Sequence, residues 1–339
     1  MATITRAVTR LSANGVVANS GWRPSTGGRP SELLAYDGAG LQAVGVSVTE
    51  RGASGAVMTL NGDVTRRDSE VFDVQDGPEA RLERTLKLIE RLITKPEGRI
   101  CGVGVAVPGV VGTSGRLSAI HELGWDRLAL GDLLSRHVDM PVIVDNDANC
   151  LAVSEHLRGA GRGVDNLVGL VVSSGLGAGI IANGQLYRGL HHEAGEIGYL
   201  LTERQSLRHL FPGRGDLEQL IGGDRVLAKA AEFGLASAEE ATLPRLISLG
   251  LRTTGAAREF SEELLDWTTL AVSTMCVVLD PEMVIIGGGG TESEMGDVIE
   301  GVCNRLPGRI LRVPRIEAAA LGDDAVVIGA AQLALPAYG

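Results

Sequence analysis

Three turns within residues 144–199 restrict what the chain can fold into and bind more than any other feature of its sequence. The first turn is rich in carboxylates and amides, the second in glycine, and the third is acidic; they span residues 145–149, 173–179 and 194–198. The turns lie around one apolar, strand-like segment. Carboxylates beside a glycine-rich turn suit a polyhydroxylated small molecule bound next to a phosphate loop.

Strand and helix patterns alternate from about residue 41 onward, which predicts an α/β architecture with a ligand cleft at the strand ends. The two halves of the chain look like related α/β units. Expected strands cover residues 41–48, 55–60, 100–111, 141–147, 168–174, 177–186 and 283–290. The first two are expected to pair through a turn at 51–54, and 168–174 with 177–186 through Asn183-Gly184. Helices are expected at 79–93, 151–158, much of 216–279, and 323–335.

The length and composition indicate a two-lobed globular protein. A chain of 339 residues is too long to form one compact core. Its content of 44% hydrophobic and 22% charged residues is typical of a globular protein. No apolar run reaches the roughly 18–20 residues of a membrane span, and the N-terminus lacks the apolar region of a signal peptide. The cysteines are far apart and are expected to be buried thiols, which predicts a cytoplasmic protein with no membrane partner; they are Cys101, Cys150, Cys276 and Cys303.

Charge is unevenly distributed along the chain. Residues 1–31 contain Arg6, Arg10, Arg23 and Arg29 and no acid, a net charge of +4. Because the whole chain has a net charge of −11, the remaining residues carry −15. A basic segment on an acidic body is typical of a DNA-contacting arm joined to a sensor. Four arginines on a solvated terminus are the alternative interpretation.

The N-terminal pattern predicts a helix, a strand, a basic loop and a second strand. Residues 3–14 place apolar side chains on one helical face and threonines and arginines on the other, and Asn14-Gly15 predicts the helix end. Short strands are expected at 16–17 and 33–34. This order is that of the second half of a winged helix-turn-helix. The apolar face holds Ile4, Ala7, Val8 and Leu11, and the polar face holds Thr3, Thr5, Arg6, Thr9 and Arg10.

Together with the Asn146-Asp147-Ala148-Asn149 motif and the AGEIG turn at 194–198, these segments resemble the ROK family, which groups sugar kinases with sugar-responsive transcriptional repressors. The resemblance implies a two-lobed α/β, actin/hexokinase-like (ribonuclease H-like) fold with a partial N-terminal winged-helix element. In repressors of this family, earlier helices pack on the apolar stripe, so the sequence is expected to begin partway through that domain. The expected units are residues 1–36 (recognition helix and wing), 37–144 (first lobe), 145–320 (second lobe with the sugar-site motifs) and 321–339 (a C-terminal helix packing back on the first lobe).

The resemblance also implies a sugar site formed by Asn146, Asp147, Glu196 and Glu218. A carboxylate at the end of a strand can accept hydrogen bonds from a sugar hydroxyl and remove its proton during phosphoryl transfer. Asp147 matches the catalytic base of the family's kinases and would have that role only if kinase activity is retained. An Asx turn that caps the next helix is the other interpretation of residues 146–149, and each glutamate alone could be a surface acid.

Two glycine-rich segments separate the kinase and sensor interpretations. The turn at 173–179 resembles the family's second phosphate loop, with Ser174, Gly175 and Gly177 as its remnant; a tight glycine hairpin is the alternative. The first phosphate loop of the kinases reads Asp-x-Gly-Gly-Thr, but residues 47–51 read Ser-Val-Thr-Glu-Arg. Because phosphoryl transfer depends on positioning and charge neutralisation, ATP and Mg²⁺ are expected only under a kinase alternative.

A zinc site found in many family members is expected to be lost. A histidine and three cysteines form it, and the matching positions here hold Tyr199, His209, Phe211 and Asp216. Two possible ligands are too few for a structural zinc, so no metal and no cofactor are expected. The change puts the geometry of Glu218 in question, because the loop before it needs another group to order it.

The function predicted from these features is a sugar-responsive transcriptional regulator that binds operator DNA and forms a homodimer or homotetramer. Arginine reads guanine bidentately, and threonine reaches phosphates or thymine methyls. The alternatives are an ATP-dependent, glucokinase-like sugar kinase and a sugar-binding protein that has lost DNA binding. The expected DNA contacts are Thr5, Arg6, Thr9 and Arg10 on the helix and Arg29 on the wing.

Overall fold

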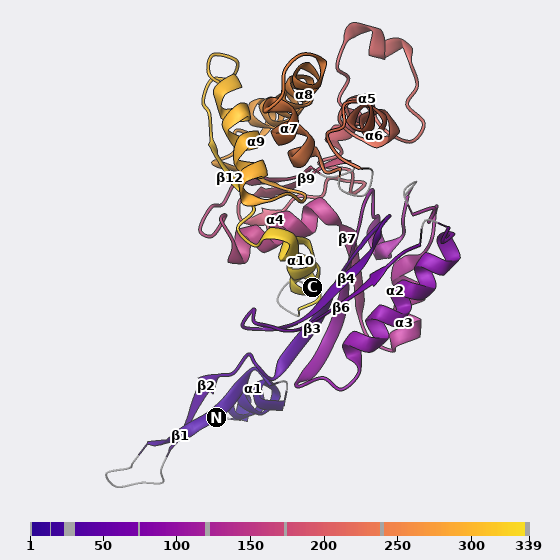
Figure 1. The fold of residues 1–339 in the computed structure, drawn as a ribbon. Helices are drawn as coiled ribbons and strands as arrows, with labels where there is room; N and C mark the ends of the chain where they lie inside the picture. Colours follow the sequence, from indigo (N-terminus) through magenta and orange to yellow (C-terminus); the bar gives the residue numbers. More distant parts are fainter. Residues whose placement is uncertain are drawn as a thin grey trace.

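The computed structural model describes residues 2–13, 15–23, 31–73, 75–118, 123–172, 175–237 and 241–335. Two of the predicted site residues, Arg29 and Ser174, lie outside the described residues. The described chain forms two five-stranded sheets, a separate two-stranded sheet, and helices that cover the sheets (Figure 1).

The first large sheet has the strand order β5-β4-β3-β6-β7. β3 pairs antiparallel with β4 and parallel with β6, and β7 pairs parallel with β6. Apolar side chains of α2 (Pro78–Ile93) and α3 (Leu130–Val138) pack on one face, and α10 (Ala325–Leu333) packs on the other. The strands are β3 (Leu41–Thr49), β4 (Gly52–Thr59), β5 (Val64–Val71), β6 (Arg99–Val107) and β7 (Val142–Asn146).

The second large sheet has the order β10-β9-β8-β11-β12, which is the same connectivity as the first. In both, the first three strands in sequence are antiparallel neighbours and the last two join in parallel. This repetition supports the prediction of two related α/β halves. The strands are β8 (Leu167–Val172), β9 (Leu176–Ala182), β10 (Gln185–Leu186), β11 (Met283–Gly287) and β12 (Arg315–Ala318).

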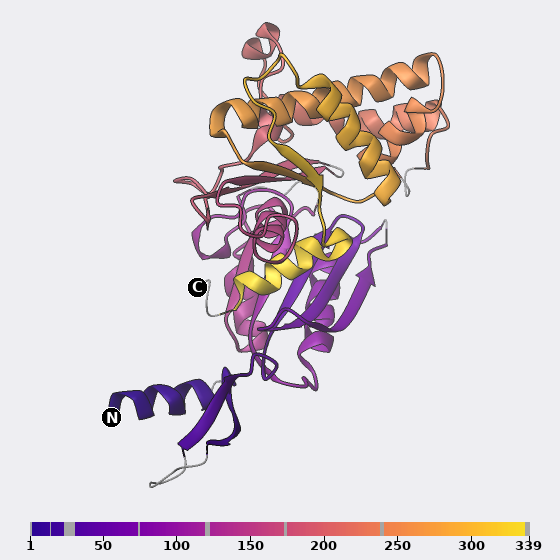
Figure 2. The same ribbon diagram turned by 90° about the vertical axis from the view of Figure 1, so that its left-hand side faces the viewer.

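Helices cover both faces of the second sheet. The outer face packs on a mostly helical layer, and α4 (Asp147–Arg158) lies on the inner face. Figure 2 shows α10 crossing between the two lobes, where it meets α4. The backbones of α10 and α4 lie so close together that a Cβ at Gly329 of α10 would lie 1.9 Å from the carbonyl oxygen of Cys150. The outer layer contains α5 (Asp216–Ile221), α6 (Gly223–Glu232), α7 (Leu243–Leu251), α8 (Ala256–Leu279) and α9 (Glu292–Arg305).

The N-terminal segment extends away from this body (Figures 1 and 2). It consists of α1 (Ala2–Ala13) followed by β1 (Val17–Arg23) and β2 (Ser31–Tyr36), which pair antiparallel. The strands are longer than the pairs of residues predicted. Ile4 on the apolar stripe is 71% exposed and Leu11 is 41% exposed, so the stripe is uncovered in this structure.

Three local predictions were wrong. Strand pairing continues to Thr49 and Gly52, so the β3–β4 turn is at Glu50-Arg51 rather than at 51–54. Asn183-Gly184 joins β9 to β10, so it is not the turn between β8 and β9. α4 begins at Asp147 rather than at 151, because Asn146 caps it.

The cysteines are all free thiols, and none is paired in a disulfide. Cys150 and Cys276 are buried, while Cys101 and Cys303 are partly buried. Burial raises the pKa of the Cys276 thiol to about 11, so this thiol stays protonated and unreactive at neutral pH. No helix in the described part of the chain is both long and apolar enough to cross a bilayer.

Candidate functional site

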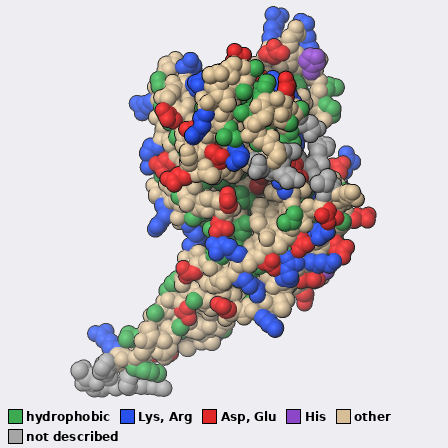
Figure 3. All heavy atoms as spheres, in the orientation of Figure 1, with side chains coloured by type: hydrophobic (Ala, Val, Ile, Leu, Met, Phe, Trp, Pro, Cys, Tyr) green, Lys and Arg blue, Asp and Glu red, His purple; other side chains and the backbone are tan. Residues whose placement is uncertain are grey.

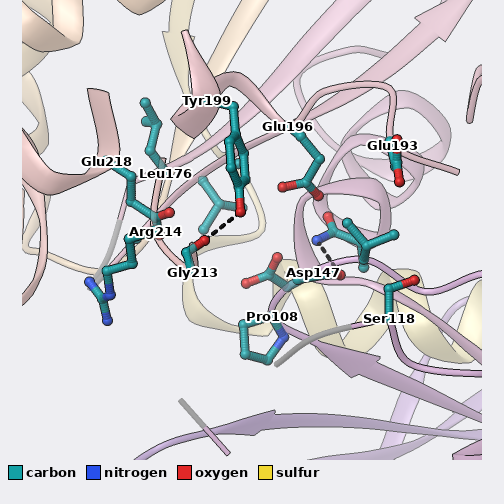
Figure 4. Close-up of a pocket in the computed structure, with 16 residues that line it drawn as sticks. Pro108, Ser118, Asp147, Leu176, Glu193, Glu196, Tyr199, Gly213, Arg214 and Glu218 are labelled. Carbon is teal, nitrogen blue, oxygen red and sulfur yellow. Dashed lines mark hydrogen bonds between the residues drawn. The ribbon is translucent and has the colours of Figure 1, made fainter. Parts of the chain in front are cut away.

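A pocket of about 520 Å³ lies between the two lobes (Figure 4). The turns after β6 and β7 line one side of it, and the turn before β9, the segment after β10 and α5 line the other. The structure therefore brings together residues more than 70 positions apart. All the described residues predicted for the sugar site and the phosphate-loop remnant line this pocket: Asn146, Asp147, Gly175, Gly177, Glu196 and Glu218.

Asn146 and Asp147 stand at the junction of β7 and α4. The Asn146 side-chain oxygen accepts hydrogen bonds from the backbone N–H of Ala148 at 2.8 Å and of Asn149 at 3.2 Å, and its amide donates to the Gly109 carbonyl at 3.1 Å. The Asx cap therefore exists, and it fixes the first turn of the helix. Asp147 follows as the first helical residue, where the helix dipole favours a negative charge.

Two further carboxylates, on segments that follow the second sheet's β10, face Asp147 (Figure 4). Glu196 immediately precedes a short 3₁₀ helix, Ile197–Tyr199, and Glu218 lies on α5. A Cβ on Gly175 would lie 2.7 Å from the Glu218 carboxylate, so glycine allows this carboxylate to approach the glycine turn. Several carboxyl groups around one cavity suit a ligand with several hydroxyl groups.

The sequence did not assign several other residues that line the pocket. They include Ser118, Glu193, Tyr199 and Arg214. From the sequence, Tyr199 is identified only as a replaced zinc ligand, and no role is assigned to Glu193. The position of Glu193 three residues before Glu196 could have indicated that both belong to one ligand-facing turn.

Hydrogen bonds order the loop in which the family's zinc ligands would lie. The backbone N–H and hydroxyl of Thr202 donate to one oxygen of Asp216 at 2.7 and 2.9 Å, and the Tyr199 hydroxyl donates to the Gly213 carbonyl. Burial raises the pKa of Asp216, but hydrogen bonds from Ser206 and Thr202 outweigh it, so the pKa lies below its ordinary value. These contacts hold the segment that leads into α5 and Glu218.

The turn that corresponds to the first phosphate loop is a tight hairpin. Glu50 and Arg51 form the two-residue connection, and the Arg51 N–H donates to the Thr49 hydroxyl at 3.3 Å. The Arg51 guanidinium also donates to the Ala241 carbonyl of the opposite lobe, at 3.4 Å. Ala241 lies near the glycine turn after β11, since a Cβ on Gly289 would lie 3.6 Å from Thr242. An arginine from the first lobe thus spans the cleft here.

The predicted DNA-contacting residues of α1 are all exposed. Thr5, Arg6, Thr9 and Arg10 lie on a helix far from the pocket, in the projecting segment. The Thr9 hydroxyl donates to the Thr5 carbonyl at 2.9 Å. An ordinary amphipathic helix would expose these side chains equally, so their role in DNA binding stays a prediction.

Paired sheets of identical connectivity, with a pocket between them, define a two-lobed actin/hexokinase-like protein. Residues 44–337 match the model of the ROK family, and the chain belongs to that family.

The chain is similar to both branches of the family. It is 26% identical over 308 residues to a glucokinase of Halalkalibacterium halodurans, covering 84% of this chain and 92% of the relative. It is 27% identical over 346 residues to a xylose repressor of Caldicellulosiruptor bescii, covering 97% and 86%. Among solved structures, a ROK family transcriptional regulator described as a homolog of the E. coli MLC protein gives a TM-score of 0.77 at 22% identity, covering 98% of this chain and 88% of that one.

Proposed function

We propose that this protein is a sugar-responsive transcriptional regulator of the ROK family rather than a sugar kinase. The single observation that carries the proposal is the Glu50-Arg51 hairpin at the position of the kinases' first phosphate loop. A two-residue turn with a glutamate offers no glycine pair for a phosphate to approach and no aspartate for its metal ion. Glu50 would also repel the triphosphate.

The extent of the similarity supports the same choice. The alignment with the xylose repressor includes 97% of the chain, which takes in most of the projecting N-terminal segment, whereas the family model begins at residue 44. Residues 1–31 of that segment hold four arginines and no acid, and the segment forms a helix and a two-stranded ribbon. A helix and ribbon of this kind suit contact with DNA.

The ligand of the pocket would be a sugar or sugar derivative held by Asp147, Glu196 and Glu218, with Asn146 fixing the first of these. Asp147 follows β7 of the first sheet, whereas Glu196 and Glu218 follow β10 of the second, so a ligand that binds all three favours one arrangement of the two sheets over others. In a homo-oligomer, such a shift changes the spacing of the DNA-contacting elements, to which half-site recognition is sensitive. The coupling between ligand and DNA is limited by the ligand's preference for one arrangement.

A sugar kinase is the second candidate, and Asp147 is the observation that favours it. Its carboxylate lines the pocket at the position of the kinases' base, with Gly175 and Gly177 nearby. In that mechanism Asp147 would take the proton of the attacking hydroxyl while Mg²⁺ neutralised the phosphates.

A coupled ADP-release assay separates the two candidates. Purified protein, Mg-ATP, and D-glucose, D-xylose or N-acetyl-D-glucosamine are combined, and thermal shift with the same sugars reports binding. The proposal predicts that at least one sugar raises the melting temperature by mass action while ADP release stays at the sugar-free background. Sugar-dependent turnover that Asp147→Asn abolishes would establish the kinase instead.

A further inference from the structure

An ion pair between Asp145 and Arg188 joins a strand of the first large sheet to the segment that follows the β10 strand of the second. Asp145 is in β7 of the first sheet, and Arg188 follows β10 of the second. The Arg188 guanidinium donates to one oxygen of Asp145 from Nε at 3.0 Å and from Nη2 at 2.6 Å. The Asp145 side chain is only 6% exposed and that of Arg188 is 31% exposed. Neither residue lines the 520 Å³ pocket; both line a separate cavity of about 350 Å³.

The other oxygen of Asp145 organises the turn that carries Asn146 and Asp147. It accepts the backbone N–H of Asn146 at 2.8 Å and the side-chain amide of the buried Asn149, also at 2.8 Å. One carboxylate thus fixes the backbone of the helix-cap residue, Asn146, and a side chain within the first turn of α4. Its orientation determines where Asp147 enters the pocket.

Arg188 organises the second carboxylate-bearing turn, after β10, as Asp145 organises the first. The Arg188 carbonyl accepts the backbone N–H of Ala194 at 3.1 Å, which closes the segment 188–194 that carries Glu193 and leads into Glu196. The backbone of Arg188 therefore holds one group of pocket carboxylates, and its side chain holds the turn that carries the other. A buried carboxylate that loses its cation keeps an uncompensated charge, so the pair resists independent movement of the two turns.

We propose that Arg188 is a positioning residue that couples the Asn146–Asp147 turn to the Glu193–Glu196 turn, so that the pocket carboxylates act as one unit. The proposal rests on the sugar-binding function given above. Arg188 lies outside the pocket, and the proposal is that it sets the distance between the carboxylates of these two turns.

Hydrogen–deuterium exchange tests the coupling without a ligand. Arg188→Met is compared with wild type and with Arg67→Met, which removes an exposed ion pair of equal length to Asp324 at 2.6 Å. The proposal predicts faster amide exchange in both residues 145–149 and residues 187–196 of Arg188→Met, and in neither segment of Arg67→Met. Unchanged exchange in either segment of Arg188→Met would overturn it.

Sugar binding gives the second readout. With whichever of the three sugars binds wild type, calorimetry is expected to show at least a tenfold rise in Kd for Arg188→Met and no change for Arg67→Met. Glu196→Gln should weaken binding less in the Arg188→Met background than alone, because coupled positions are not additive. Additive effects would indicate that Arg188 only stabilises the fold.

Arg188→Lys keeps the charge but loses the paired donors, and is expected to give smaller changes in the same direction. If Arg188→Met does not fold, Arg188→Lys is used for the test. Amide exchange and sugar affinity equal to those of wild type in Arg188→Lys would then overturn the proposal. If wild type binds none of the sugars, the proposed function fails, while amide exchange still decides the role of Arg188.

Discussion

Asp216 illustrates how one residue can take over a structural task. At this position the resemblance placed a zinc ligand, and the carboxylate instead accepts two hydrogen bonds from Thr202. The loop before Glu218 is thereby closed by the protein's own groups. A hydrogen bond to a charged acceptor contributes about 1.5–3 kcal/mol, which is enough to order a short surface loop.

The lowered pKa of Asp216 gives a pH-dependent prediction. Because the folded-state pKa lies below the ordinary 3.8, its stabilisation is present above that value and is lost as pH falls through the lowered pKa. Asp216→Asn should therefore lower the free energy of unfolding by about 1–2 kcal/mol near neutral pH. Urea denaturation should show the two proteins converging in acid; a difference that is constant with pH would contradict this account.

Residue-level contacts across the lobes were the part of the site that the sequence could not reveal. Asn146, Asp147, Glu196 and Glu218 were identified because their motifs are local, and the structure places all of them on one pocket. The partnership of Asp145 with Arg188 joins positions 43 residues apart. No local pattern specifies such a pair, because it depends on how two sheets pack.

At the scale of elements, two glycines within helices differ in what surrounds them. Close packing between helices requires glycine at Gly329, whereas nothing packs against Gly296. A Cβ on Gly329 of α10 would meet the backbone of α4, whereas a Cβ on Gly296 of α9 has no neighbour within 4 Å. Both glycines are within helices, so alanine improves helix propensity at each by about 1 kcal/mol. Only at Gly329 does a steric clash oppose this gain.

Gly329→Ala is therefore expected to destabilise the protein by about 1–3 kcal/mol, and Gly296→Ala to stabilise it by up to about 1 kcal/mol. Chemical denaturation of the two variants measures both values. Equal effects of the two substitutions would show that α10 and α4 are not in the close contact described.

Periodicity predicted the buried elements better than the exposed ones. The strands at residues 41–48 and 283–287 and the helix at 79–93 were recognised because their apolar side chains form the core. β5 was not predicted because every residue in it is partly or fully exposed, and β12 is only four residues long. α9 was also missed, although Thr291 and Glu294 form a capping box that could have marked its start.

For the whole molecule, the charge distribution gives the main functional prediction. Residues 1–31 hold four arginines and no acid, whereas the rest of the chain has a net charge of −15 and shows red and blue side chains intermingled on the face in Figure 3. An acidic body disfavours non-specific contact with DNA. Any DNA binding should therefore depend on α1 and the ribbon.

Selection from a random duplex library, followed by fluorescence anisotropy, tests that dependence. Arg6→Ala and Arg10→Ala should each weaken binding to a selected sequence by about 1–3 kcal/mol, whereas Arg67→Ala on the body should have no effect. Affinity should fall as salt concentration rises. Enrichment of no sequence at any salt concentration, or equal loss with Arg67→Ala, would contradict a regulatory role for this segment.

The most direct measurement is a crystal structure of the protein grown with its sugar and Mg-ATP. The account predicts an ordered sugar whose hydroxyls donate to Asp147, Glu196 and Glu218, with no ordered triphosphate beside residues 47–51. Ordered β- and γ-phosphates with a metal ion at the Glu50-Arg51 hairpin would contradict it.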